Sequence, residues 1–573
     1  MILGIILFVG FILRIAFVSR AWMIPFNYLS DASQYFVWAR SIVAGKEFVK
    51  VYHQAPLYPF FLSFIFILFG SSIKAALFIQ ALLGVISCYL VYHITIRLFR
   101  NRWIGLLSAF LMAIYAPAIF YNGMLLMATL VSFLYLVFIV VLLKALEENK
   151  FWIWGVAGIT LGLSALARGT ILLFIPFLIL YLIGIVWKAG MIEKDKRERM
   201  NLIMQKGAYP SIAFLLGVFI MILPVTLRNY IKGKDLVLIN ANAGITFYEG
   251  NNPWATGMYM DPPGLDLGED FNGAKIAGYL EKRPLRPSEV SRFWFDESWR
   301  YIQENPLNFL KLIGKKLAYF WNQYEIPNAE NIYFAEKYSR IFHIPLLSFL
   351  FAGPLGVLGI IMAFGRKVSR VFILLLFLLS HMVSIVLFFI AARYRLPITP
   401  LLIIFMSYAI YTIKEEIKDK RYVMLGIYCG IGLLLFILVA YPWKGLNKKR
   451  DYAAGFDNIG ILFHLKGNYR KAIQYYTMAL DHDPGFIKAY NNMGGAYLAL
   501  NKKEDALKCW YRGLEHDPDF PLIHINLGKI FASEGKKKEA EKAYRIAADD
   551  TPYSIQMRHI MKGFSAADTK EKI

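Results

Sequence analysis

One carboxylate and several arginines are the side chains of this sequence best placed to do chemistry. Asp31 lies in the stretch "NYLSDASQYFVWARSIVAG" (27–45), whose apolar residues recur at helical spacing. An amphipathic helix of this kind usually lies along a membrane surface, where a lone carboxylate is unusual. Arginines stand at the ends of four long apolar segments, at Arg168, Arg228, Arg393 and Arg395. Because a guanidinium binds phosphate in a planar fork, the set predicts a carboxylate that faces guanidiniums around a lipid phosphate.

Structural interpretations compete with this one. The residues "SDASQ" are typical of a helix start, where Asp31 would cap the helix and Gln34 would bond back to it. Capping and catalysis are compatible if one oxygen of Asp31 stays free. An arginine at a span end can also simply extend its charge to the lipid headgroups. Arg14, inside the first apolar segment, is a functional candidate because charge is costly in lipid.

The composition is that of a polytopic membrane protein. Of the 573 residues 57% are hydrophobic, and the mean hydropathy is +0.47, so several apolar runs are long enough to cross a bilayer. The segment 56–70 is too short for an untilted span and is interpreted as interfacial or re-entrant. The first apolar segment has no basic region or cleavage site before Arg20, which predicts an uncleaved span. We expect spans at 2–18, 73–96, 103–121, 124–143, 151–167, 170–187, 207–227, 341–364, 371–391, 396–412 and 422–441.

The net charge of +23 belongs almost entirely to the membrane part, because the tail after 450 is nearly balanced. Basic residues gather in the loops 97–102, 188–206, 366–370 and 414–421. Such loops stay on the cytoplasmic side, so the Asp31 segment, the 228–340 loop and the chain after 442 are predicted on the other side. The basic stretch Lys444–Arg450 goes against this rule for the last span. No surface suited to nucleic acid is indicated. The three scattered cysteines give neither a disulfide framework nor a metal cluster.

The tail is an internal repeat of 34 residues. Gly, aromatic, Ala, aromatic and Pro recur in this order at that period, which is typical of tetratricopeptide repeats. Their helical hairpins stack into a solenoid. We expect repeats at about 453–486, 487–520 and 521–554, followed by "YSIQMRHIMKGF" as a cap. Equivalent asparagines either grip an extended peptide or occupy a position where Asn is common; they are Asn458, Asn492 and Asn526.

At these residues the chain resembles the GT-C superfamily of integral-membrane glycosyltransferases, specifically the protein O-mannosyltransferase and aminoarabinose-transferase type (glycosyltransferase family 39). The matching pieces run in the family's order from residue 1 to about 440. They are "SDASQYFVWARSIVAG", "APLYPFF", "GLSALARGT", "LRNY", "GITFYEGNNP", "ENPLNFLKLIGKKLAYFWN" and "ARYRLPITP". A core of this type followed by tetratricopeptide repeats is also similar to animal O-mannosyltransferases that carry such repeats on the lumenal side.

The resemblance implies an all-α fold in two parts. A GT-C-type membrane core of about eleven spans would occupy 1–442, with outer loops at 19–72 and 228–340. A tetratricopeptide solenoid would occupy 451–573. The implied reaction moves a sugar from a polyprenyl-phosphate donor, with inversion, on the extracytoplasmic face.

The resemblance also assigns residues to roles. Asp31 would assist the displacement, and the family's phosphate-binding arginine would fall on Arg393 or Arg395, with Arg228 as a further candidate. Many relatives place a second acid at the outer end of the fourth span. This chain has no Asp or Glu between Gly105 and Lys144, so that role is absent or has moved, for example to Glu249.

Four other residues are candidate contacts to the sugar or the acceptor: Tyr35, His53, Glu249 and Asn251. Tyr35 would orient Asp31 or simply bury its ring, and His53 would assist proton transfer or be structural. Arginines that neutralise the phosphate would make a metal unnecessary. A divalent cation at Asp31 stays open as a cofactor.

Two classes of function remain. The first is a glycosyltransferase whose acceptor is a protein Ser/Thr, a lipid or a glycan, with repeats that recruit the acceptor or a protein partner. The second is a membrane-anchored tetratricopeptide scaffold or a transporter. An anchor needs neither eleven spans nor a face of arginines, and the chain lacks the internal symmetry of transporters. The absence of any Asn-x-Ser/Thr sequence favours a prokaryotic plasma (inner) membrane.

Overall fold

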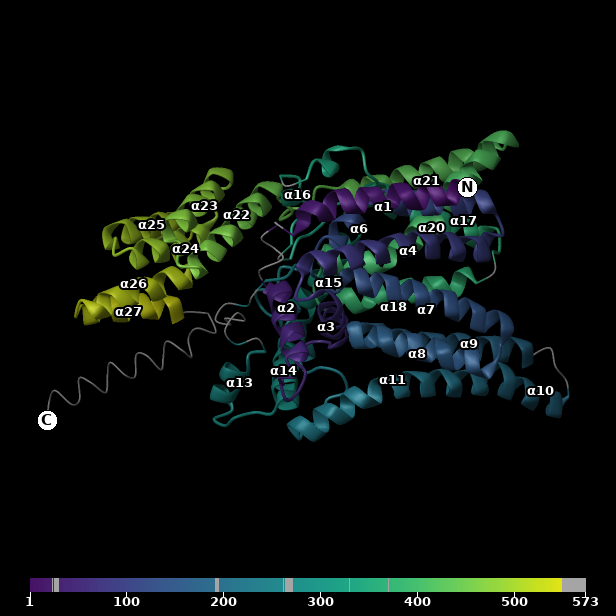
Figure 1. Ribbon diagram of the computed structural model, residues 1–573, viewed down its shortest axis with the longest axis horizontal. Helices are drawn as coiled ribbons and strands as arrows, with labels where there is room; N and C mark the ends of the chain where they lie inside the picture. Colours follow the sequence, from purple (N-terminus) through teal and green to yellow (C-terminus); the bar gives the residue numbers. More distant parts are fainter. Residues whose placement is uncertain are drawn as a thin grey trace.

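The computed structural model describes residues 1–548 except 23, 25–29, 191–194, 261, 263–269, 271, 329, 338 and 369. In this part of the chain the regular structure is helical. A bundle of roughly parallel helices forms one body, and a solenoid of six helices extends from one end of it (Figure 1). This confirms the predicted all-α membrane core with a C-terminal α-solenoid.

The bundle consists of apolar helices. Within the described residues, seven helical segments are long and apolar enough to cross a membrane, and five apolar helices are shorter. Every expected span coincides with at least one helix. The bundle helices are α1 (Ile2–Ala21), α4 (Ile73–Phe99), α5 (Arg102–Ala113), α6 (Ala116–Asn122), α7 (Ala128–Glu148), α8 (Phe151–Ala167), α9 (Phe174–Gly190), α11 (Tyr209–Gly233), α17 (Phe349–Gly365), α18 (Val371–Val386), α20 (Thr399–Lys418) and α21 (Tyr422–Ala440).

Shorter helices cluster at the end of the bundle that carries the solenoid. There α2 and α14 run across the direction of the bundle helices (Figure 1). At only 13 residues α3 is too short to cross a bilayer, and it packs on α2. These shorter helices are α2 (Ser30–Val43), α3 (Leu57–Phe69), α12 (Ala243–Gly250), α13 (Ala274–Leu280), α14 (Pro287–Glu304), α15 (Pro306–Trp321), α16 (Ile332–Ala335) and α19 (Ala392–Arg395).

The opposite end of the bundle is basic. It carries α10 (Lys196–Ile203), and ion pairs join the other basic loops there. Arg97 lies 3.4 Å from Glu147, which also pairs with Arg370. Arg366 and Arg421 share Glu416. The loops predicted to be cytoplasmic therefore meet at one end of the molecule.

Glycines bring two pairs of bundle helices into backbone contact. A Cβ on Gly158 of α8 would lie 1.9 Å from the carbonyl oxygen of Phe214 on α11, and one on Gly359 of α17 would lie 1.9 Å from that of Phe405 on α20. Small residues allow such approach in membranes, where packing rather than water exclusion drives helix association. These contacts fix the bundle that carries the site.

Arg14 has a structural role in α1. The chain breaks between α5 and α6, where the carbonyl of Met112 accepts turn-type bonds from the N–H groups of Ile114 and Tyr115. The guanidinium of Arg14 donates to the carbonyls of Met112 and Ala113, at 3.3 and 3.0 Å, and to the side-chain oxygen of Asn122 at 2.8 Å. The buried charge thus satisfies backbone groups that lipid could not.

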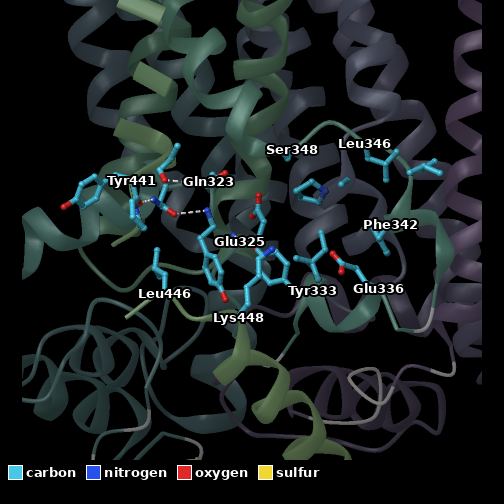
Figure 2. A pocket seen from close by; sticks show the side chains of 18 residues that line it. Gln323, Glu325, Tyr333, Glu336, Phe342, Leu346, Ser348, Tyr441, Leu446 and Lys448 are labelled. Carbon is cyan, nitrogen blue, oxygen red and sulfur yellow. Dashed lines mark hydrogen bonds between the residues drawn. The ribbon is translucent and has the colours of Figure 1, made fainter. Parts of the chain in front are cut away.

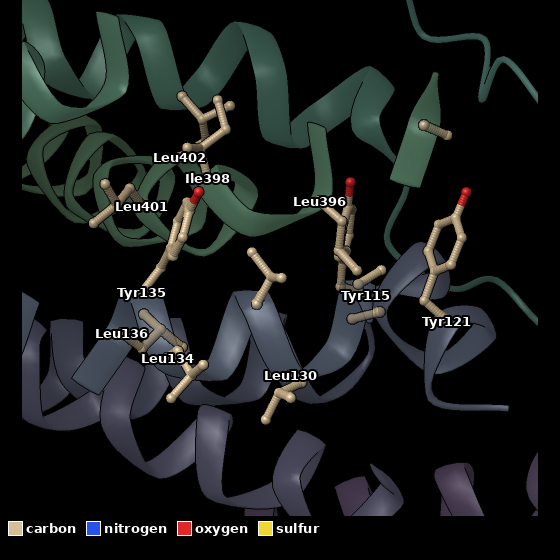
Figure 3. Close-up of a cluster of buried hydrophobic side chains, with 14 of the residues drawn as sticks. Tyr115, Tyr121, Leu130, Leu134, Tyr135, Leu136, Leu396, Ile398, Leu401 and Leu402 are labelled. Atoms are coloured by element: carbon tan, nitrogen blue, oxygen red, sulfur yellow. The ribbon is translucent and has the colours of Figure 1, made fainter. Parts of the chain in front are cut away.

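The core of the bundle positions the segment before α20. Figure 3 shows Tyr135 of α7 pointing toward Ile398 and Leu402. All three are buried. This packing fixes the backbone that directly follows α19, and α19 holds two of the predicted arginines.

The solenoid consists of three helix pairs. Its first pair packs on α16, where Gly455 allows the Phe334 ring to approach the helix backbone and Phe456 lies against Phe334 with ring centroids 5.1 Å apart. The hydroxyl of Tyr324 donates to Asp451. The six helices are α22 (Lys448–Leu465), α23 (Tyr469–His482), α24 (Ile487–Ala499), α25 (Lys503–His516), α26 (Pro521–Ser533) and α27 (Lys537–Ala548). The proposed cap lies outside the described residues.

Candidate active site

An ion pair joins two segments that are 362 residues apart in the sequence. Nη1 of Arg393, on α19, donates to Oδ2 of Asp31 at 2.7 Å. Asp31 lies in the first turn of α2, and its other oxygen accepts from Nε2 of Gln54 at 3.3 Å. The structure therefore brings together the predicted carboxylate and one of the predicted arginines. Asp31 is 20% exposed, so its carboxylate remains accessible.

A second carboxylate contacts the same arginine. Oε1 of Glu330 lies 3.6 Å from Nη1 of Arg393, and Glu330 is only 2% exposed. Burial raises the pKa of Glu330, and the negative charge of Asp31 acts in the same direction. Glu330 was not among the residues predicted for the site.

A second guanidinium lies beside Arg393. Arg168, at the end of α8, places its guanidinium 3.8 Å from the centre of the Tyr394 ring, and Arg393 lies 4.9 Å from the same ring. Both arginines line a small pocket with Tyr35 and Tyr394, whose other walls are apolar. Two cations in the wall of a pocket whose other lining is apolar suit an anion.

Two of the candidate contacts lie near Asp31. Tyr35 is buried, and its pKa is raised by burial and by the charge of Asp31. His53 stacks on Trp38 with ring centroids 6.0 Å apart. Burial lowers the pKa of His53 although Asp31 opposes the shift, so the ring is neutral at physiological pH.

Arg395 and Arg228 are held by backbone partners. Nη1 of Arg395 donates to the carbonyls of Phe320 and Asn322 at 2.8 and 2.6 Å, and Nη2 lies 2.9 Å from Glu325. Arg228 donates to the carbonyls of Lys50 and Val49 and lies over the Tyr52 ring at 4.0 Å. Each arginine fixes a loop beside the site and does not contact Asp31.

Asn251 and Glu249 belong to the packing around α12. The amide of Asn251 donates to the carbonyls of Phe247 and Leu387 at 2.9 and 2.8 Å, and its oxygen accepts from Lys316 at 2.9 Å. Both N–H groups of the Asn251 amide thus donate to partners within the protein. Glu249 is buried in the same helix, which packs on α14.

The repeat asparagines bond between neighbouring repeats. Nδ2 of Asn492 donates to both oxygens of Asp457, at 3.0 and 3.2 Å, and Nδ2 of Asn526 donates to Asn491 at 2.9 Å. Asn458 is half-buried at the equivalent position of the first repeat. The contacts of Asn492 and Asn526 favour a role in stacking the repeats over a role in gripping a peptide.

The described residues contain no group of three or more His, Cys, Asp or Glu side chains that could hold a metal ion. Asp31 and Glu330 are both turned toward Arg393. A divalent cation at Asp31 was predicted as an option. Such a cation would compete with Arg393, with which both carboxylates already pair.

Comparison with known families finds similarity in both parts of the chain. Residues 53–199 match the family of dolichyl-phosphate-mannose-protein mannosyltransferases, and residues 456–488 and 487–520 match tetratricopeptide repeats. A segment of the membrane part is thus similar to this family, and the C-terminal part is similar to tetratricopeptide repeats. This confirms the resemblance inferred from the motifs. No curated protein matches the chain.

Two solved structures are similar to the chain. One is the Archaeoglobus fulgidus oligosaccharyltransferase in the apo form, with 14% identity over 80% of this chain and a TM-score of 0.39. The other is the archaeal oligosaccharyltransferase of the same organism in complex with an inhibitory peptide and a dolichol-phosphate, with 13% identity over 79% of this chain and a TM-score of 0.38. The alignments cover 58% and 55% of those chains, so this chain spans a little over half their length.

Proposed function

We propose that the protein is a glycosyltransferase that moves a sugar from a polyprenyl-phosphate donor to an acceptor hydroxyl, with inversion, on the extracytoplasmic face. The observation that carries this proposal is the Asp31–Arg393 ion pair beside the pocket that also holds Arg168. The match to a mannosyltransferase family supports it.

In the proposed reaction the acceptor oxygen forms a bond to the anomeric carbon while the bond from that carbon to the phosphate oxygen breaks. Asp31 takes the hydroxyl proton as general base. The departing polyprenyl phosphate keeps the electron pair of the broken bond, and Arg393 and Arg168 stabilise its charge. When Arg393 turns to the phosphate, Oδ2 of Asp31 becomes free, while Gln54 still holds Oδ1.

The solenoid would recruit the acceptor or a protein partner. Its first repeat packs on α16, two residues after Glu330 in the chain. An acceptor bound along the solenoid would therefore be delivered close to the pocket. The acceptor class, whether protein, lipid or glycan, is set by what the solenoid binds.

The test is sugar transfer by the purified full chain in lipid nanodiscs with a panel of polyprenyl-phosphate sugars. Asp31→Asn removes the base and is expected to lower turnover by about 10²- to 10⁴-fold without changing the melting temperature. Asp296→Asn, at an exposed carboxylate on α14, is the matched control. Near-normal turnover by Asp31→Asn would end the base assignment. Absence of transfer by the unaltered protein would favour the scaffold or transporter alternative.

A further inference from the structure

A short helix, α6, lies between two cavities of the protein. Its start lines a cavity of about 500 Å³, whose wall also includes Glu325 and Lys448 (Figure 2). Its end leads into the segment 123–127, which contributes to the wall of the small pocket of Arg168 and Arg393. Because a cavity provides no atoms to pack against, the position of α6 depends on contacts at its other end.

Gln80 supplies such contacts from α4. The segment after α6 is buried, with Asn122 exposed by 3% and Met124 by 0%. Carbonyls at a helix end lack the regular helical partners, and a buried carbonyl without a hydrogen bond costs free energy. Nε2 of Gln80, which is itself fully buried, donates to the carbonyls of Asn122 and Met124 at 3.1 and 2.7 Å. One amide group thus holds the backbone that carries Leu126 and Met127, both in the pocket wall.

The same amide reaches another wall of the pocket through its oxygen. Oε1 of Gln80 accepts from the hydroxyl of Tyr58, on α3, at 2.7 Å. The Tyr58 ring meets the Tyr35 ring edge-on, with centroids 5.1 Å apart. Tyr35 lines the pocket and lies on α2, one helical turn from Asp31. The orientation of the amide is fixed, because only its nitrogen can donate to the two carbonyls.

The neighbouring contacts of α6 do not join these two walls. Oδ1 of Asn122 accepts from Arg14 of α1, and its Nδ2 donates to Thr129 of α7 at 3.1 Å. These hydrogen bonds fix α6 to the bundle and involve neither tyrosine. Gln80 therefore links the two walls of the pocket through a single side chain.

We propose that Gln80 is a positioning residue of the sugar-donor site, because it sets the separation between the segment 123–127 and Tyr35. This role rests on the proposed function, in which the phosphate of the sugar donor enters the pocket. Leu126, Met127 and Tyr35 are uncharged, so their displacement changes how well the sugar donor fits and not the charges that act during transfer. Loss of Gln80 should therefore weaken binding of the ground state and the transition state alike, which raises KM and leaves kcat unchanged.

The test is transfer kinetics of the full chain in nanodiscs, with the polyprenyl-phosphate sugar that the unaltered chain uses, followed by release of polyprenyl phosphate. Gln80→Met keeps the length of the side chain and removes its hydrogen bonds. It should raise the KM for the sugar donor about tenfold or more and keep kcat within about threefold. Tyr58→Phe is the milder variant and should raise the same KM without adding to the effect of Gln80→Met in the double variant, because both act through one amide. Thr95→Val is the matched control, since it removes a buried hydrogen bond between α4 and Ser108 and lines neither cavity.

Hydrogen exchange of residues 122–127 in the same nanodiscs, without any sugar donor, shows whether Gln80 holds this segment. Exchange should be about tenfold faster or more in Gln80→Met and unchanged in Thr95→Val. Unchanged exchange in Gln80→Met would overturn the proposal. Faster exchange with an unchanged KM would also overturn it, since Gln80 would then have a structural role alone, and so would a loss that falls on kcat. Absence of transfer by the unaltered chain would remove the proposed function and this role of Gln80 with it, and that result is seen before any variant is measured.

Discussion

At the scale of single residues, Arg393 lies between two carboxylates, and this sets the electrostatics of the proposed donor site. Asp31 and Glu330 both offset its charge, so a donor phosphate must compete with them for the guanidinium. Protonation of one carboxylate removes part of that competition. Because burial raises the pKa of Glu330, this residue takes up a proton at a higher pH than an exposed glutamate does.

Glu330→Gln should therefore change the pH dependence of donor binding. In the unaltered protein, affinity for a polyprenyl-phosphate sugar should fall as pH rises through the pKa of Glu330, because a negative charge appears beside the phosphate site. The phosphodiester of this donor keeps one charge over the pH range used, unlike a phosphate monoester, whose second pKa is about 6. The glutamine variant should bind more tightly above that pH, by about tenfold, and show a flat profile. Equilibrium binding between pH 4 and 8 measures this. Glu304→Gln, at an exposed acid of α14, should keep the original slope. An unchanged slope in Glu330→Gln would contradict the assignment.

Local sequence patterns predicted Asp31 and left Arg393 and Arg395 as alternatives. Asp31 is the acid of an amphipathic stretch, and Arg393 follows an apolar segment. Glu330 has no such local mark, since its position beside Arg393 results from how the chain after α15 packs against α19. Arg168 was visible as a span-end arginine. Nothing in the sequence separated it from Arg228, which binds the carbonyls of a neighbouring loop.

At the scale of elements, backbone contact between α8 and α11 fixes the helix whose end carries Arg168. A Cβ on Gly158 would fall 1.9 Å from a carbonyl oxygen of α11, whereas one on Gly184 of α9 meets no atom within 4 Å. Gly158→Ala should lower the free energy of unfolding by about 1–3 kcal/mol, because the helices must separate to admit the methyl group.

Gly184→Ala is the matched control and should be neutral or slightly stabilising, since alanine favours a helix by up to about 1 kcal/mol. Thermal unfolding of both variants in the same detergent, followed by tryptophan fluorescence, gives the comparison. If both glycines behave alike, the close contact between α8 and α11 does not limit stability.

The first repeat contains a buried acid with a testable pH signature. Burial raises the pKa of Asp457 from 3.8 to about 6. A carboxyl with a raised pKa in the folded state contributes stability while it is protonated, and this contribution is lost as pH rises from about 4 to about 6. Asp457→Asn can still accept from Asn492 and carries no charge. It should remove the pH dependence and stabilise α22–α24 by about 1–3 kcal/mol at pH 7.5.

Hydrogen exchange of α22–α24 in the full chain measures this stability at pH 5 and 7.5. Asp481→Asn, at an exposed acid of α23, should change neither value. If the stability of the Asp457→Asn variant still falls from pH 5 to pH 7.5, Asp457 is not the source of the pH dependence.

Helix type could be predicted far better than helix junctions. Apolar length and the 34-residue period were sufficient for the spans and the repeats, because each pattern lies within one continuous segment. The segment 103–121 was predicted as a single span, whereas the structure divides it into α5 and α6. Arg14 donates to the carbonyls of Met112 and Ala113 at this break, and a contact of that range leaves no trace in local sequence.

At the scale of the whole molecule, the solenoid and α2, which carries Asp31, lie at one end of the bundle, and α10 lies at the other (Figure 1). We therefore expect the solenoid and the proposed active site to share a compartment. The basic stretch Lys444–Arg450 lies at the solenoid end, against the charge rule. We expect the packing of α22 on α16 to outweigh that local charge signal.

Cysteine labelling in right-side-out vesicles tests this arrangement. Lys282→Cys, between α13 and α14, and Lys503→Cys, on α25, should react with a membrane-impermeant maleimide, whereas Lys420→Cys, after α20, should react only once the membrane is permeabilised. All three lysines are exposed, and of the native cysteines Cys88 and Cys509 are buried, so the unaltered chain provides the background. If the cysteines at 503 and 420 both react only after permeabilisation, the solenoid lies on the side of the basic loops. The solenoid could then no longer deliver an acceptor to Asp31, because α2 and α25 would face different compartments.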